Sequence, residues 1–180
     1  MLLSTTTDAA DIDALKAGVF NPARQAPDFS VRGSDGTALT LSRYRGKVVV
    51  LGFGYTSCAD VCPVTLAVLA LAHRKLGTLA SQVQVIYLTV DPERDSVERL
   101  KGYLAAFDPS FVGGTGTALQ MAEVRKSYGV TAEKHGTRKD YAVAHSSFVY
   151  LITREGKLRA LMPFGHKADD YVHDISVLLN

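Results

Sequence analysis

The sequence predicts an α/β fold, in which helices alternate with the strands of a partly parallel sheet. The first indication is the apolar run VVVLGF at 48–53, which has the length and composition of a strand buried on both faces. The second is a similar run, VQVIYLTV at 83–90, which follows a helical stretch rich in Ala and Leu. The third is a strand at 147–152 that a turn connects to one more strand, which adds antiparallel edges. Helices packed on a mixed sheet follow from this order.

The domain is expected to begin after a lead-in. Residues 1–26 are predicted to be a flexible N-terminal segment closed by Pro22 and Pro27, and residues 27–180 to form a single domain without internal repeats. A short hairpin is expected over 29–41, because the turn sequence GSDG separates two short apolar stretches.

Four helices are expected along the rest of the chain. The first covers 65–76 and stops at Gly77. The second begins at Asp95, a good N-cap with Glu98 three residues later. The other two are expected at 117–128 and 169–179. The N-terminal hairpin, a βαβα core and a C-terminal ββα unit together make a thioredoxin-like sandwich.

The composition gives no indication of nucleic-acid binding. The chain has 20 Lys and Arg against 18 Asp and Glu, a formal charge of +2 and no dense basic run. The first residues, MLLSTTTDAADIDALKAG, contain too few apolar side chains for a signal peptide or a membrane span. Two alternatives remain for how the protein relates to a membrane. Either the protein is soluble as made, or it associates only through an anchor that was removed and is absent from this chain.

The chain has two cysteines, Cys58 and Cys62, between the first buried strand and the helix after it. A disulfide between them would close a very short loop and stabilise the fold little. At a helix start the free N–H groups favour thiolates, so both thiols are expected to be more acidic than usual. If the turn that carries them is helical, the side chains at i and i+4 share a face, which suits a bridging metal ion, while a redox disulfide is also within reach. The spacing alone does not decide between metal binding and redox chemistry.

A metal site would need a third ligand, because two thiolates do not close one. Most of the histidines are unsuitable. His73 lies roughly 16 Å along the helix axis from Cys62 at the usual rise per residue. His166 and His173 are expected at the surface. His135 is expected in a mobile loop, where it would be at most an auxiliary ligand.

His145 is the candidate ligand. It ends the stretch AVAH directly before the strand at 147–152, near the helix that carries the cysteines. A lone histidine there is more often a hydrogen-bonded core residue, but the two thiols favour a ligand. Thioredoxin-like oxidoreductases have a cis-proline at about this place, whereas this chain has no proline between Pro109 and Pro163. An imidazole therefore takes the place of a substrate-binding proline.

The chain resembles the Sco/SenC family, copper-binding proteins of thioredoxin fold that assist the maturation of cytochrome c oxidase. The resemblance covers about 26–178. It rests on the segments APDFSV, GKVVVLGFGYTSCADVCPVTL, YLTVDPERDSVERLKGYLAAFDPSFVGGTG and HSSFVYLITREGKL, in this order.

The resemblance implies that Cys58, Cys62 and His145 bind one copper ion, as Cu(I) or Cu(II), and that the two cysteines form a redox-active pair. It implies a metallochaperone that supports maturation of the binuclear copper centre of cytochrome c oxidase subunit II. The expected partners are the copper domain of that subunit and other copper chaperones or thiol reductants. The expected location is the periplasmic face of the bacterial inner membrane. Soft thiolates suit Cu(I), and an added imidazole makes Cu(II) accessible too.

Three positions depart from the family pattern. Ala59 stands where Pro is usual, Ser57 where His or Phe is frequent, and Ala144 where Asp commonly precedes the histidine. Without that acid, the chain lacks one means of orienting the imidazole. Tyr55 is expected to cover the site, and Asp91 to lie at the same end of the sheet.

Other interpretations use the same residues. A thiol–disulfide oxidoreductase would keep partner cysteines reduced without carrying copper. A peroxide-reducing enzyme is disfavoured, since it expects Thr three residues before the attacking cysteine and Thr56 lies two before Cys58. Zinc with a water as fourth ligand also satisfies the donor set. His145 separates the first two functions, because metal binding needs it and dithiol exchange does not.

Overall fold

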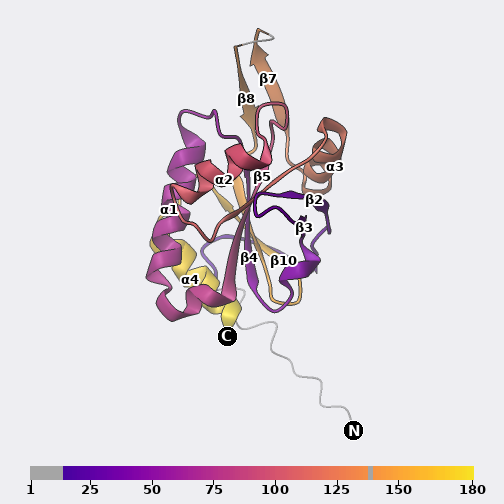
Figure 1. Ribbon diagram of the computed structural model, residues 1–180. Coiled ribbons are helices and arrows are strands. Elements are labelled where there is room, and N and C mark those ends of the chain that lie inside the picture. Colours follow the sequence, from indigo (N-terminus) through magenta and orange to yellow (C-terminus); the bar gives the residue numbers. More distant parts are fainter. Residues whose placement is uncertain (1–13, 138–139) are drawn as a thin grey trace.

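The computed structural model describes residues 14–137 and 140–180. In these residues the chain forms an eight-stranded sheet, a separate two-stranded sheet and four α-helices (Figure 1). The strand order in the large sheet is β1-β10-β9-β4-β5-β6-β2-β3. The strands are β1 Gly18–Gln25, β2 Ser30–Gly33, β3 Ala38–Thr40, β4 Val48–Gly54, β5 Val83–Thr89, β6 Val112–Thr115, β7 Ala132–Gly136, β8 Tyr141–His145, β9 Phe148–Ile152 and β10 Lys157–Pro163. The helices are α1 Val61–Lys75, α2 Val97–Ala105, α3 Ala118–Tyr128 and α4 Ala168–Leu179.

Strand β4 forms the middle of the molecule, as its apolar run predicts. All its residues are buried, and it pairs in parallel with β5 and antiparallel with β9. Strand β6 extends the parallel part on the far side of β5. Because β4 and β5 run the same way, the loops that follow them meet at one end of the sheet. The predicted thioredoxin-like arrangement is therefore confirmed.

The helices cover both faces of this sheet. Neighbouring residues of a strand point to opposite faces. Gly54 faces Cys62 of α1, whereas the ring of Phe53 lies 5.7 Å from the ring of Tyr128, at the end of α3. Helices α1 and α3 therefore lie on opposite faces, and α4 packs beside α1 (Figure 1).

The predicted boundary of the domain at residue 27 is wrong for the part of the lead-in that the structure describes. Residues 18–25 form strand β1, which pairs with β10 at the edge of the large sheet. The strand was missed because Pro22 interrupts its pattern. The register shifts between Val19 and Arg24, and proline is tolerated at such an irregularity in an edge strand. Residues 1–13 of the predicted lead-in lie outside the described part.

The polar segment after α3 differs from the mobile loop that was expected. Residues 132–136 form β7, which pairs with β8 in an antiparallel hairpin that projects from the body of the molecule (Figure 1). His145, at the end of β8, is directly opposite Ala132. This strand has no sequence signal, because its consecutive polar residues are exposed and include no apolar run. The hairpin supports the residue expected as the third ligand.

Across 14–137 and 140–180, none of the helices has both the length and the apolar character that crossing a membrane requires.

Candidate metal centre

The two cysteines lie in different local structures. Helix α1 begins at Val61, so Cys62 is in its first turn and Cys58 is in the loop before it. Only Cys62 lies in the helix, so the condition for a shared helix face, a helical turn through both cysteines, is not met. Both are free thiols. Cys62 is buried with 2% of its surface exposed, while Cys58 is partly exposed.

The pKa values of the two thiols move in opposite directions. The pKa of Cys58 lies below its ordinary value, because the backbone N–H groups of Asp60 and Cys62 and the Tyr55 hydroxyl outweigh its partial burial. Burial raises the pKa of Cys62 to about 12. The expectation of two acidic thiols is correct for Cys58 and wrong for Cys62, because the helix start cannot offset the loss of water around a fully buried sulfur.

His145 meets Cys62 across the end of the sheet. Its Nε2 lies 3.5 Å from the Cys62 sulfur. Its Nδ1 lies 2.9 Å from the backbone carbonyl of Ser146, which can only accept, so Nδ1 carries the proton in the neutral ring. The lone pair of Nε2 therefore points toward the sulfur. The Ser146 carbonyl orients the ring in this chain, where Ala144 offers no side-chain acceptor.

Tyr55 covers the imidazole, as expected. The two rings meet edge to face with centroids 6.0 Å apart. The Tyr55 hydroxyl accepts a 3.2 Å hydrogen bond from the backbone N–H of Val143 in β8. This contact ties the loop before Cys58 to the strand that ends at His145.

Asp95 has a different role from the predicted N-cap. Ser96 caps α2 instead, since its hydroxyl accepts from the N–H of Arg99. The Asp95 carboxylate is fully buried and accepts hydrogen bonds from the Thr56 N–H at 3.1 Å, the Thr56 hydroxyl at 2.5 Å and the Thr89 hydroxyl at 2.7 Å. It thereby fixes the loop two residues before Cys58. Sequence spacing alone could not show which of the adjacent polar residues Asp95 and Ser96 caps α2.

Asp91 anchors the hairpin. It is fully buried at the end of β5, where it pairs with Arg94 and accepts a 2.8 Å hydrogen bond from the Tyr141 hydroxyl. Arg94 also stacks on the Tyr141 ring, with its guanidinium carbon 3.8 Å from the centroid, and donates to the Tyr141 carbonyl. The expected position of Asp91 at this end of the sheet is confirmed. Its contact with β8 could not be predicted without knowing that the hairpin exists.

The remaining histidines contact carboxylates and not the two thiols. His73 contacts Asp108, His166 contacts Asp170, His173 contacts Asp174, and His135 lies near Glu133 on β7. The prediction that His73 is separate from the site is consistent with its partner on another loop. Asp60 occupies the N-cap position of α1 without a capping side-chain hydrogen bond.

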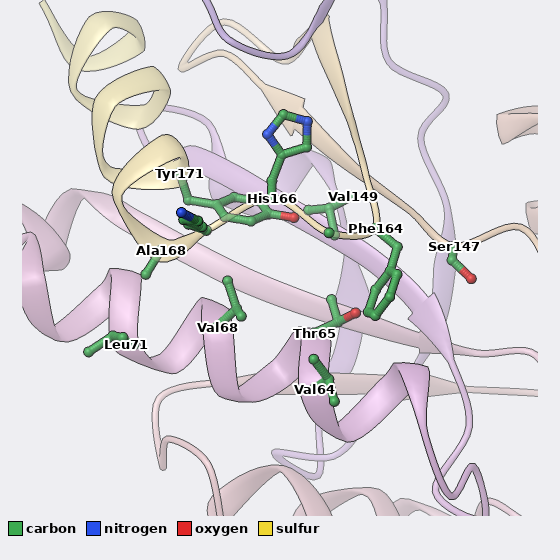
Figure 2. Close-up of a pocket in the computed structure, with 12 residues that line it drawn as sticks. Val64, Thr65, Val68, Leu71, Ser147, Val149, Phe164, His166, Ala168 and Tyr171 are labelled. Carbon is green, nitrogen blue, oxygen red and sulfur yellow. The ribbon is translucent and has the colours of Figure 1, made fainter.

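An apolar groove adjoins the site along α1. Its volume is about 370 Å³, and Figure 2 shows Val64, Thr65 and Val68 facing Phe164 and Tyr171 across it. It holds neither cysteine. A narrower pocket, which shares Thr65, Ser147 and Val149 with the groove, contains Cys62 and His145. The chemistry of the site therefore belongs to the narrower pocket.

Two thiols and an imidazole at the strand-to-helix junction define a thioredoxin-like protein of the metal-binding or thiol-redox class. The chain matches the SCO1/SenC family over residues 19–180 and belongs to that family. It is 38% identical over 133 residues to the mitochondrial SCO2 homologue of Bos taurus. The matched residues make up 72% of this chain and 50% of the bovine protein. The chain thus spans about half the length of that relative.

Two solved structures show the same fold. Bradyrhizobium japonicum ScoI with copper bound is 33% identical, with a TM-score of 0.80 over 86% of this chain and 99% of that one. BsSco is described as having a disulfide switch and as a member of the Sco family of cytochrome c oxidase assembly proteins. It is 25% identical, with a TM-score of 0.68 over 87% of this chain and 94% of that one.

Proposed function

We propose that the protein is a copper metallochaperone that binds one Cu(I) or Cu(II) ion through Cys58, Cys62 and His145. The observation that carries the proposal is the 3.5 Å approach of His145 Nε2 to the Cys62 sulfur, in which the Nε2 lone pair faces the thiol. Soft sulfur and borderline imidazole donors suit copper in both oxidation states. The copper-bound ScoI structure, similar over most of this chain, supports the same choice of metal.

Closing the site requires movement of Cys58. Within the described ranges, no three His, Cys, Asp or Glu side chains are already arranged to hold a metal ion. Cys62 and His145 are held by α1 and β8, whereas Cys58 lies on a loop and is partly exposed. Rotation of the Cys58 side chain is therefore the expected ordering step. Because the pKa of Cys58 is lowered, this thiol loses its proton first, and Cys62 releases its own when the ion arrives.

Each residue then has a distinct part. Cys58 captures the ion from solvent, and Cys62 and His145 hold it in the pocket beneath Tyr55. The Ser146 carbonyl keeps the proton on Nδ1, so Nε2 is ready to bind without a tautomer change. The bound copper ion is the cargo, and the protein catalyses no reaction in this function.

Thiol chemistry gates this function and provides the second candidate. Oxidation of Cys58 and Cys62 to a disulfide removes two protons and two electrons and consumes both thiolate ligands, so copper and the disulfide exclude each other. Two thiols whose pKa values move in opposite directions also suit a thiol–disulfide oxidoreductase that keeps partner cysteines reduced. The exposed, more acidic Cys58 would be the attacking thiol.

The proposed recipient is the copper domain of cytochrome c oxidase subunit II, with other copper chaperones or thiol reductants as further partners. The description of BsSco as a member of a family of oxidase assembly proteins supports this choice. The proposed location is the periplasmic face of a bacterial inner membrane. A reductant is needed there, because cysteines tend to oxidise in that compartment.

Titration of the reduced protein with Cu(I) and Cu(II) tests the proposal. Wild type is expected to bind one equivalent of each, and Cys58→Ser and His145→Ala to weaken Cu(II) binding at least about tenfold. His135→Ala is the matched control, because it removes an exposed imidazole from the neighbouring strand. The copper function is wrong if wild type binds no copper or if His145→Ala binds Cu(II) equally well. Retained reduction of a partner disulfide by His145→Ala would then favour the oxidoreductase.

A further inference from the structure

Tyr87 presents an unexplained polar group in the core. It stands in the apolar strand β5, only 1% of its surface is exposed, and within the described residues no hydrogen-bond partner is assigned to its hydroxyl. A buried hydroxyl without a partner is unfavourable, and phenylalanine would fill the same space without that penalty. The hydroxyl therefore needs a reason to be there.

The hydroxyl lies beside the Cys62 sulfur, in a space that glycines leave open. The parallel register places Gly52 opposite Tyr87 and Gly54 opposite Thr89. A Cβ added at Gly52 would lie 3.1 Å from the Tyr87 ring. A Cβ added at Gly54 would overlap the Tyr87 hydroxyl and lie 2.8 Å from the Cys62 sulfur. The missing side chain of Gly54 thus creates the space in which the hydroxyl and the sulfur meet.

We propose that the Tyr87 hydroxyl donates a hydrogen bond to the Cys62 sulfur and holds this sulfur toward His145. Tyr87, Cys62 and His145 line the same narrow pocket. A phenol is a donor, and sulfur is a weak acceptor as a thiol and a better one when it carries negative charge on a metal. The contact therefore strengthens when the sulfur becomes a ligand. Tyr87 is a positioning residue, and its effect on copper rests on the proposed function.

A comparison of Tyr87 with Tyr103 is consistent with that role. A phenol is protonated at neutral pH, so the Tyr87 hydroxyl can donate. Tyr103 is the other tyrosine in this region whose hydroxyl has no partner in the described residues, but it is a residue of α2 and does not line the narrow pocket. The geometry thus singles out Tyr87 as the donor.

Tyr87→Phe tests the contact in two ways, with Tyr150→Phe as the matched control. Tyr150 has a similarly buried ring in β9, and its hydroxyl donates to the Tyr128 carbonyl. In metal-free reduced protein carrying Cys58→Ser, Cys62 is the single thiol, and Raman spectroscopy records its S–H stretching band. We expect Tyr87→Phe to shift this band and Tyr150→Phe to leave it unchanged.

The second readout uses copper and intact cysteines. Tyr87→Phe is expected to shift the sulfur-to-Cu(II) charge-transfer absorption and to weaken Cu(I) binding about tenfold, the order found for groups that support metal ligands. Tyr150→Phe is expected to change neither. Tyr87→Phe should not lower the melting temperature, because the hydroxyl has no other partner to lose.

The outcomes separate the contact from the copper function. An S–H band that does not respond to Tyr87→Phe overturns the proposal, whatever the copper result. If wild type binds no copper but the S–H band shifts, the proposed function fails and the Tyr87 contact stands. Equal shifts in Tyr87→Phe and Tyr150→Phe would also overturn it, because the effect would then be a general response of the core.

Discussion

The Tyr141 hydroxyl donates a 2.8 Å hydrogen bond to the buried carboxylate of Asp91. The bond connects the two sheets, since Asp91 lies in the loop after β5 of the large sheet and Tyr141 begins β8 of the small one. This bond and the Tyr55 contact with Val143 attach the hairpin to the body of the molecule. The position of the His145 imidazole therefore depends on side chains outside its own strand.

Tyr141→Phe should loosen the hairpin without disturbing the large sheet. The change leaves Asp91 with one fewer donor, and a hydrogen bond to a charged group contributes about 1.5–3 kcal/mol. We expect faster amide exchange in β8 and unchanged exchange in β4 and β5, measured by hydrogen–deuterium exchange. Tyr103→Phe is the control, because its hydroxyl has no partner among the described residues. Unchanged exchange in β8 would contradict the anchoring role.

Asp95→Asn should release the loop that carries Cys58. The amide keeps one acceptor oxygen where the carboxylate serves Thr56 and Thr89, so we expect a loss of about 1.5–3 kcal/mol in urea unfolding. The alkylation rate of Cys58 should change as well. The neighbouring Ser96→Ala removes the cap of α2 at a cost of about 1 kcal/mol and should leave that rate unaltered. Equal effects of both variants on Cys58 would argue against a specific tether.

The two thiols should react in a fixed order. The pKa of Cys58 is below its ordinary value of 9.0 and that of Cys62 is about 12, so near neutral pH the thiolate fraction is larger at Cys58. Alkylation of the reduced, metal-free protein with iodoacetamide, followed by peptide mass spectrometry, should therefore label Cys58 first. As pH is raised, the alkylation rate of Cys58 should reach its plateau at a lower pH than the alkylation rate of Cys62. Preferential labelling of Cys62 would show that the assignment is reversed.

Acid should weaken the metal-free fold through His145. Burial lowers the folded-state pKa of this imidazole below its ordinary value of 6.5, so the unfolded chain binds the proton more readily. The contribution of His145 is thus full above pH 6.5 and is lost as pH falls below it toward the folded pKa. Urea unfolding between pH 7.5 and 5 should show a smaller loss of stability in His145→Gln than in wild type. His135→Gln is expected to behave like wild type.

Most of the fold could be predicted because its elements have strong local patterns. The apolar runs of β4 and β5 and the turn sequence before β3 fixed the type and order of these strands. Strand β1 and the hairpin of β7 and β8 were missed, since each is exposed along much of its length. Edge pairing depends on what lies beside the strand, and single-sequence patterns do not contain that information.

The candidate site was predictable in its residue types but not in its environment. Cys58, Cys62 and His145 could be selected from spacing and context, and the approach of Cys62 to His145 agrees with that selection. The raised pKa of Cys62 could not be predicted, because it depends on how deeply the first turn of α1 is buried. Tyr87 left one signal in the sequence, a polar tip within an otherwise apolar strand, which becomes meaningful only beside Gly54.

The glycine at position 54 also limits which sequences this fold accepts. Since a methyl group there would occupy the place of the Tyr87 hydroxyl, positions 54 and 87 cannot vary independently. Gly54→Ala is expected to be far better tolerated together with a small residue at 87 than with Tyr87, so the two substitutions should be strongly non-additive. In a redesign of the site, the residues at positions 54 and 87 therefore have to be chosen together. A sequence that keeps a phenol beside the sulfur must keep a bare backbone facing it.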